Sequence, residues 1–373
     1  MRKNNKINSR NMFAAITAGI MLCAGSVQAS EKPTLNFYTW ADYISQDVLK
    51  AFKAETGSEV VLQVYDSTEI MQAKMLTGHS GYDLVITASD TLGPQLKAGV
   101  YAKLDKSKLS NYANLDPEIL KQMANIDPGN EHAVPYLFGT TGVVYEEQAV
   151  RKALGDMPFP DNPLALIFEP EYAKRLQSCG VSLMDSPFET MPMMLHYLGR
   201  PVSNPSADDI EAATQQLLKV TPYVRQFTSM ITVNLASGNL CAAMGYSGDA
   251  ALGNQRLIDA KSPLRLSYAY DLKKGTKLWV DNFAIPADAK NPQLAMQFID
   301  FILRPENAAK IANELQYATP NKAATPLLDP AFVANPYQFP EASVQARLYP
   351  VNLSQKEQRT MTRAFNKLRS AAK

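Results

Sequence analysis

The sequence predicts an α/β protein with a mostly parallel sheet and helices on both faces. The mature part of the chain begins with short apolar runs that alternate with amphipathic segments, and this alternation is typical of strand–helix–strand units. The chain has 373 residues, more than one hydrophobic core usually holds, so two domains are expected. Apolar residues make up 46% and charged residues 20% of the chain, as in an ordinary globular protein.

The first strand and helix have clear boundaries in the sequence. Residues 35–40 are apolar and aromatic, which predicts a strand. Ser45 can cap the following helix, in which Val48 and Phe52 share one face, and Gly57 can end it.

The alternation continues through the next two strand–helix units. We expect strands at 59–64 and 82–86, and helices at 69–76 and 91–97. Ligands bind beyond the carboxyl ends of strands in such sheets. Trp40, Asp42 and the loop 87–90 follow expected strands, so they lie at the expected binding edge.

A second lobe is expected beyond residues 135–142. Glycine, threonine and proline in this segment break the alternation and suit an extended connection between lobes. Mixed α/β patterns follow at 174–183, 187–197 and 207–219, then strands at 239–245 and 278–285, a loop at 246–249 and an amphipathic helix at 291–303. We place lobe 1 at 30–137 and 255–310, and lobe 2 at 138–254 and 311–373.

The first 29 residues predict a secretory signal peptide. Positive residues precede an apolar stretch at 12–24, which is shorter than the roughly 20 residues that a membrane anchor needs. Small residues at Val27 and Ala29 suit cleavage after Ala29. We therefore expect an exported protein of the periplasm. The positive residues are Arg2, Lys3, Lys6 and Arg10.

Charge disfavours nucleic acid as a partner. Removing the four positive residues of the leader from 37 Lys and Arg leaves 33, against 36 Asp and Glu. The mature chain is slightly acidic and has no basic stripe, so we expect no nucleic-acid binding.

Two cysteines remain after the leader, Cys179 and Cys241. Export places them in an oxidising compartment, which favours a disulfide between them over two buried thiols. A disulfide that closes the loop between Cys179 and Cys241, roughly 60 residues long, would add a few kcal/mol of stability.

The sequence contains no recognisable catalytic or metal-binding motif. Its three histidines have no metal-ligand spacing, and no glycine-rich phosphate loop is present. Residues 245–249 approach a nucleophile elbow but have Asp249 where the last glycine belongs. We expect no enzyme, no cofactor and no metal, although a pair of carboxylates in a glycosidase leaves no motif to search for.

Several segments in one order carry a resemblance to a known family. The chain resembles the substrate-binding proteins of polyamine ABC importers, in particular the putrescine-binding member. The resemblance implies a type II periplasmic binding protein, in which two α/β lobes close over a ligand in the cleft between them. The segments are DS at 66–67, GYDLV at 81–85, QLKAGV at 95–100, LDKSKL at 104–109, NLDPE at 114–118, SCGVS at 178–182, PADAKN at 286–291 and NKAATPL at 321–327.

The resemblance also implies a set of ligand-binding residues. Five motifs of the family supply carboxylates and aromatic rings. They lie after the first strand, after Asp-Ser-Pro, in the 245–249 loop, at the Trp-x-Asp pair and just before 321–327. These residues are Trp40, Asp42, Glu189, Tyr246, Asp249, Trp279, Asp281 and Tyr317.

This set suits a protonated diamine. A buried ammonium needs carboxylates, because burying it unpaired is prohibitive. Burial of four methylenes contributes roughly 3 kcal/mol, cation–π contacts add about 0.5–2 kcal/mol per cation, and micromolar binding needs about 8 kcal/mol. The carboxylates should therefore decide the affinity.

The chain departs from the family pattern at one end of the site. Ala41 and Ala88 stand where the family has serines, and Asp90 adds a carboxylate. Asp90 could bind an additional amine, so a longer or differently ended cation is expected as readily as putrescine: spermidine, cadaverine, norspermidine or agmatine.

The sequence leaves the physiological role open between two readings. The protein could deliver a polyamine to an ABC permease in the inner membrane, or it could dock on a membrane signalling protein as a polyamine sensor. The implied site contains no Arg or Lys to meet a carboxylate, which argues against amino acids. We expect a monomer that closes when Trp40 and Asp42 from one lobe, and Glu189 and Asp249 from the other, contact the ligand together.

Overall fold

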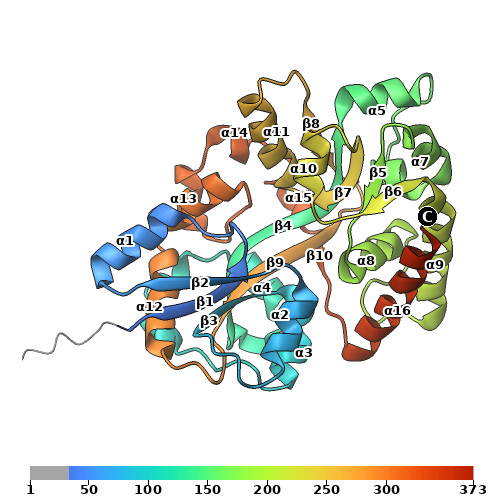
Figure 1. Cartoon of the computed structure of the whole chain (residues 1–373). Helices are drawn as coiled ribbons and strands as arrows, with labels where there is room; N and C mark the ends of the chain where they lie inside the picture. Colours follow the sequence, from blue (N-terminus) through green and yellow to red (C-terminus); the bar gives the residue numbers. More distant parts are fainter. Residues whose placement is uncertain (1–32, 373) are drawn as a thin grey trace, which may run out of the picture. The chain divides into compact units, whose positions relative to one another are not determined.

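The computed structural model describes residues 33–372, and a mixed sheet runs through them (Figure 1). The predicted signal peptide, 1–29, lies outside the described residues. The strands are β1 Leu35–Trp40, β2 Val60–Tyr65, β3 Leu84–Ala88, β4 Ala133–Glu146, β5 Val181–Leu183, β6 Val224–Phe227, β7 Ala242–Tyr246, β8 Leu266–Ala269, β9 Lys277–Ala284 and β10 Tyr349–Pro350.

Helices connect these strands and confirm the predicted α/β class. The α-helices are α1 Gln46–Thr56, α2 Thr68–Met75, α3 Ser89–Lys97, α4 Pro117–Met123, α5 Glu147–Leu154, α6 Ala165–Phe168, α7 Pro170–Leu176, α8 Pro187–Tyr197, α9 Ala207–Val220, α10 Ile231–Ala236, α11 Asp249–Asp259, α12 Pro292–Ile302, α13 Pro305–Leu315, α14 Pro330–Val333, α15 Ala342–Gln345 and α16 Gln355–Ala371. Short 3₁₀ helices lie at Lys106–Lys108, Tyr112–Asn114, Pro128–Asn130, Thr221–Tyr223 and Lys322–Leu327.

The sheet consists of two parallel groups of strands joined by an antiparallel centre. The order is β2-β1-β3-β9-β4-β7-β5-β6, with β10 beside β9 and β8 beside β4. The first strand group (β1, β2, β3) and the second strand group (β5, β6, β7) are parallel within themselves. Only the central strands β4 and β9 run antiparallel to their neighbours in this order, which the prediction of a mostly parallel sheet did not include.

The long strand β4 belongs to both parts of the sheet. Its first part, Ala133–Thr140, pairs with β9, and its second part, Thr141–Tyr145, pairs with β7. The segment 135–142, predicted as an extended connection, is the middle of this strand (Figure 1). β8 pairs with the second part of β4, so 266–269 lie beside strands predicted for lobe 2 although the predicted limits assign them to lobe 1. The lobe limits themselves remain a prediction.

The predicted boundaries of the first helix are confirmed. The Ser45 hydroxyl accepts a hydrogen bond from the Val48 amide at 3.4 Å, which satisfies one of the free amides of the first turn. Gly57 follows the helix in the left-handed conformation, at φ 70°, which a residue without a Cβ adopts at little cost.

Strand β9 is fully buried and carries several residues of the site described below. All eight of its residues are buried, and it lies between β3 and β4 in the sheet. A strand buried on both faces is usually apolar throughout. Lys277, Asp281 and Asn282 are therefore exceptions that require buried partners.

The predicted disulfide between Cys179 and Cys241 is confirmed. Their Cα atoms lie 5.5 Å apart and the bond spans 62 residues of sequence. It joins the segments that lead into β5 and β7, two neighbouring parallel strands. Among the described residues, no helix is both long and apolar enough to pass through a lipid bilayer.

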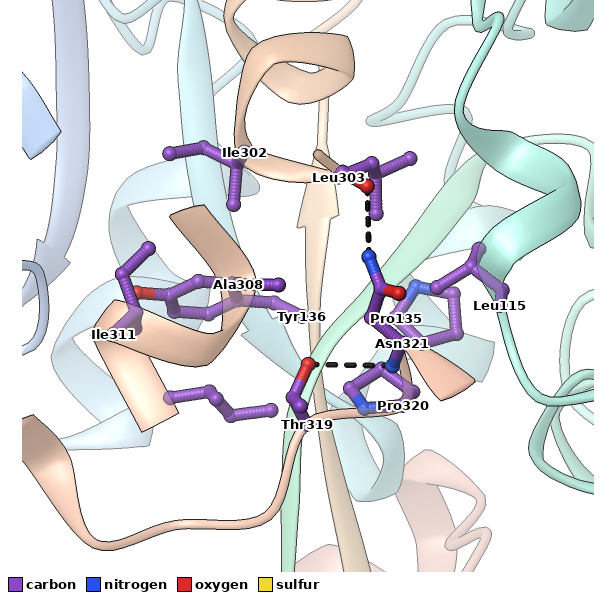
Figure 2. A pocket seen from close by; sticks show the side chains of 11 residues that line it. Leu115, Pro135, Tyr136, Ile302, Leu303, Ala308, Ile311, Thr319, Pro320 and Asn321 are labelled. Carbon is purple, nitrogen blue, oxygen red and sulfur yellow. Dashed lines mark hydrogen bonds between the residues drawn. The ribbon is translucent and has the colours of Figure 1, made fainter. Parts of the chain in front are cut away.

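A cavity of about 10 Å³ lies between the first part of β4 and the segment 319–321 (Figure 2). The Asn321 side-chain amide donates to the Leu303 carbonyl at 2.7 Å, and the Asn321 backbone amide donates to the Thr319 hydroxyl at 3.2 Å. This volume suits about one water molecule and no organic solute. These bonds hold the chain just after Tyr317, one of the predicted ligand-binding residues.

Candidate functional site

Four buried carboxylates lie at or beside the ends of strands. Asp90, Glu189 and Asp249 are in the first turns of α3, α8 and α11, and Asp281 is on β9. Their exposed fractions are only 5–8%. Helix amino ends favour negative charge because their first amides are free. Helix α3 begins at Ser89, earlier than the predicted 91, and Asp249, predicted as the end of a loop, is the first residue of α11.

Alternate residues of β9 provide one face of the site. Lys277, Trp279 and Asp281 are two residues apart, so their side chains lie on the same side of the strand. Asp281 lies opposite Ala88 of β3, and Trp279 lies opposite Gly139 of β4. The face therefore combines a cation, an aromatic ring and a carboxylate.

Lys277 is the residue that the sequence analysis missed. Its ammonium group is bound by the Glu189 carboxylate at 2.5 Å, the Asp90 carboxylate at 3.0 Å and the Phe188 carbonyl at 2.9 Å. The side chain is 1% exposed. The expectation that the site contains no Arg or Lys is therefore wrong. The predicted strand began at 278 and so excluded Lys277, although the spacing from Trp279 and Asp281 would have placed it on the same face.

Lys277, Asp90 and Glu189 form what we call the lysine end of the site. Burial lowers the pKa of Lys277, but Glu189 and Asp90 outweigh it and the net pKa is raised. Burial raises the pKa of Glu189, while Lys277 and a hydrogen bond of 2.8 Å from the Thr141 hydroxyl act against that rise. The lysine end therefore holds its own cation.

Asp249 and Asp281, together with Tyr246, Trp279 and Tyr317, form what we call the aromatic end. The Tyr43 hydroxyl donates to Asp281 at 2.8 Å. The pKa of Asp281 is raised to about 7, first by burial and then by the charges of Asp90 and Glu189, while the Tyr43 bond lowers it.

Asp249 is also bound only by neutral donors. It accepts from the Tyr246 amide at 2.7 Å and from the Thr232 hydroxyl at 3.1 Å. Burial raises the pKa of Asp249 to about 6, against these two hydrogen bonds. No cationic side chain within residues 33–372 forms an ion pair with Asp249 or Asp281.

The aromatic rings meet edge to face around Trp279. Its ring centroid lies 5.5 Å from that of Tyr246 and 5.2 Å from that of Tyr317. A Cβ at Gly139 would overlap the Trp279 ring, and one at Gly248 would come within 2.5 Å of the Tyr317 ring. Glycine at these two positions gives the rings their space.

Two buried polar atoms of the site are unsatisfied. The Trp279 indole nitrogen and the second carboxylate oxygen of Asp90 have no hydrogen-bond partner within residues 33–372. Buried polar atoms normally have one. A bound solute or water would supply it.

Tyr43 is a second residue that the sequence reasoning did not single out. It follows Asp42 in the Trp40–Tyr43 motif, and its backbone carbonyl accepts a 2.8 Å hydrogen bond from Tyr136. The Tyr43 ring contacts that of Tyr317 at 6.1 Å. It therefore orients Asp281 and closes the aromatic end.

Trp40 and Asp42 lie at the edge of this arrangement. Trp40 is half-buried and contacts the Tyr65 ring at 4.3 Å. Asp42 is exposed, with a φ of 53°, and no hydrogen bond or ion pair among the described residues joins it to the four buried carboxylates. Both line an open recess of about 440 Å³ together with Leu62 and Glu314.

Within residues 33–372, no group of three or more histidine, cysteine, aspartate or glutamate side chains is arranged to hold a metal ion.

The sequence is similar to that of known solute-binding proteins. Residues 47–341 match the model of the bacterial extracellular solute-binding protein family. The chain is 42% identical to the putrescine-binding periplasmic protein SpuD of Pseudomonas aeruginosa, over 97% of this chain and 98% of that one. It is 40% identical to the putrescine-binding periplasmic protein PotF of Escherichia coli, over 98% and 99%.

The fold is also that of solved polyamine-transporter proteins. The crystal structure of the spermidine/putrescine ABC transporter substrate-binding protein PotD from Streptococcus pneumoniae matches with a TM-score of 0.74 and 27% identity. The match covers 92% of this chain and all of that one. The predicted two-lobed binding-protein fold is thereby confirmed.

Proposed function

Because the chain belongs to the bacterial extracellular solute-binding protein family, we propose that it binds a small cation of the polyamine class in the periplasm and delivers it to an ABC importer. The relatives named for putrescine and spermidine support the ligand class. In this family the step is binding and release, so no side chain is assigned a catalytic role.

One observation carries the proposal: the site has more buried acids than buried cations. Lys277 faces Asp90 and Glu189, while Asp249 and Asp281 have only neutral donors. An ionised carboxylate is costly to bury without a cation, which is the cause of the raised pKa values of Asp249 and Asp281. An ammonium group of a ligand would remove this cost.

The aromatic rings give the ligand its apolar contacts. We assign Tyr246, Trp279 and Tyr317 to the walls along the methylene chain, and Trp40 and Asp42 to the rim. The unsatisfied Trp279 indole N–H is a donor, so a water that accompanies the solute would accept its hydrogen bond. Cation–π contacts with such rings contribute about 0.5–2 kcal/mol.

We propose that ligand binding draws the two strand groups together. Trp40 ends β1 and Asp90 follows β3, both of the first strand group, whereas Glu189 and Asp249 follow β5 and β7 of the second. A ligand that contacts residues of both groups binds the closed arrangement more tightly than the open one, and it therefore favours closure. The closed form, as a monomer, would be what the permease recognises. A membrane sensor, the alternative raised above, would dock on the same form, and neighbouring permease or signalling genes would separate the two.

Calorimetric titration of the mature chain, residues 30–373, tests the ligand class. The panel is putrescine, cadaverine, spermidine, norspermidine, spermine and agmatine, with arginine as a control, on protein stripped of bound ligand by unfolding and refolding. We expect one-to-one binding of at least one amine, and its loss in Asp249→Ala. The exposed Asp259→Ala variant, on the same helix, is the matched control. Silence of the wild type toward the whole panel would contradict the proposal.

A further inference from the structure

The ammonium group of Lys277 sits in a complete binding site for an ammonium ion. It has three protons and three acceptors, one on Asp90, one on Glu189 and the carbonyl of Phe188. Two of the acceptors are carboxylates that the sequence assigned to the ligand. The position that a ligand amine would take between Asp90 and Glu189 is therefore already filled by the chain itself.

This lysine is held firmly in place. It is the first residue of β9, next to β10 in the sheet, and its side chain is 1% exposed. The charges of Glu189 and Asp90 stabilise its protonated form despite burial. A second ligand ammonium could take the position between Asp90 and Glu189 only by displacing a buried, fully bonded cation, and only the second oxygen of Asp90 is left without a partner among residues 33–372.

Lys277 also has no free N–H donor for an anion. All three of its protons are directed at Asp90, Glu189 and Phe188. A ligand carboxylate placed here would meet two carboxylates of the protein and no free donor on Lys277. Binding of amino acids and ω-amino acids is therefore disfavoured, because Lys277 has no proton free for their carboxylate.

The aromatic end, by contrast, still lacks a cation. Asp249 and Asp281 accept hydrogen bonds from a backbone amide and from the hydroxyls of Thr232 and Tyr43, all of them neutral. Tyr317 lies between the two acids: its ring centroid is 6.1 Å from that of Tyr43, whose hydroxyl donates to Asp281, and its ring lies against Gly248, the residue before Asp249. Asp249 and Asp281 thus act on one region next to the aromatic walls.

We propose that Lys277 replaces one ammonium group of the ligand, so that the site selects an amine with a single ammonium end over an α,ω-diamine. The inference rests on the proposed function, capture of an organic ammonium ion, and moves the preferred ligand from polyamines to amines with one ammonium group. The ammonium of the solute lies at the aromatic end, between Asp249 and Asp281. Its other end, which points to Lys277, is uncharged.

The test compares three ligands of equal length that differ only at one end: putrescine, 4-amino-1-butanol and 4-aminobutanoate. Calorimetry is run on the ligand-stripped mature chain, on Lys277→Met and on the double variant Asp90→Asn/Lys277→Met. The double variant removes one charge of each sign, so it keeps the test valid should the single variant fail to fold. Lys273→Met, an exposed lysine of the preceding turn, is the control.

The wild type is expected to bind 4-amino-1-butanol at least as tightly as putrescine. The double variant should shift the ratio of the two affinities at least tenfold in favour of putrescine, because Glu189 becomes free to bind the second ammonium. The Lys273→Met ratio should equal that of the wild type.

Three outcomes would overturn the inference. The first is a wild type that prefers putrescine at least tenfold, with the same ratio in the double variant; the proposed function would then stand without it. The second is tight binding of 4-aminobutanoate by the wild type, which would show that Lys277 does meet a carboxylate. The third is silence of all proteins toward all amines, including the polyamine panel, which would remove the proposed function as well.

Discussion

The two ends of the site solve the same electrostatic problem in different ways. Each contains two buried carboxylates, but the lysine end has Lys277 between Asp90 and Glu189, whereas the aromatic end has only neutral donors. In the first, the protein itself supplies the cation, and all three protons of Lys277 have acceptors, although one oxygen of Asp90 has no partner within residues 33–372. The second is incomplete and gains from a ligand. The comparison teaches that a count of acidic residues does not give the charge of the ligand, because one buried lysine changes it.

The largest expected effect is on stability at the lysine end. Lys277→Met leaves Asp90 and Glu189 buried without a cation, and breaking a buried pair in this way costs about 3–5 kcal/mol of unfolding free energy. Urea denaturation of the ligand-free protein measures it. The double variant Asp90→Asn/Lys277→Met should recover part of the loss, and a single variant within about 1 kcal/mol of the wild type would contradict the comparison.

The same kind of change at the aromatic end should act on binding instead. Asp281→Asn removes the charge that meets the ligand, so the affinity for the amine should fall by about 1.5–3 kcal/mol. The ligand-free protein at pH 8 should lose no stability, because an uncompensated buried charge is removed and the new side-chain amide oxygen can still accept from Tyr43. Titration and urea denaturation of one preparation give both numbers. An Asp281→Asn protein that binds normally but unfolds more easily would assign this acid to the scaffold.

The pH dependence should follow the aromatic end. The pKa values of about 7 for Asp281 and about 6 for Asp249 lie above those of the unfolded chain. The folded state therefore retains protons that the unfolded state releases, and stability contributed by these groups is lost as pH rises from about 4 to 7, by at most about 1.4 kcal/mol per pH unit for each group.

Ligand affinity should change with pH in the opposite direction. A cation binds the ionised acids, so the affinity should increase from pH 5 to pH 8 and binding should release protons near pH 6. Calorimetry in two buffers of different ionisation enthalpy measures the release. The trend should flatten in Asp249→Asn/Asp281→Asn, and an affinity that is constant over this range in the wild type would contradict the assignment.

The smallest effect is expected at the rim. Asp42 is exposed, and charges in water contribute little, so Asp42→Asn should change the affinity by about twofold or less. The same titration measures it at low and at physiological salt. A loss as large as that of Asp281→Asn would show that Asp42 reaches the ligand in the closed form.

The sequence predicted the parts of the site that depend on local pattern. The alternation of strands and helices places the loop of Asp90 after a strand, and the family resemblance supplies Glu189, Asp249, Asp281 and Trp279. The pairing of Asp90 with Lys277 is different, because it joins residues 187 positions apart. It depends on β9 lying next to β3, an antiparallel neighbour that no local pattern predicts.

The same limit explains the sheet. The two parallel strand groups follow from strand–helix–strand units, which are local. The antiparallel centre follows from the chain leaving the first group along β4 and returning along β9, and this depends on contacts between distant segments. The predicted lobe limits remain a prediction, and β8, which they assign to lobe 1, lies beside β4 in the second part of the sheet.

Strand β4 pairs with β9 in its first part and with β7 in its second, and this has a consequence for the rate of closure. A slip of one residue between β4 and β9 would turn every side chain of one strand to the opposite face, and Trp279 would leave its place opposite Gly139. A rotation of the strand groups that keeps this register would twist β4 near Thr140 and Thr141, where its partner changes from β9 to β7. Capture and release should then occur at the rate of hinge bending, about microseconds to milliseconds, without waiting for local unfolding.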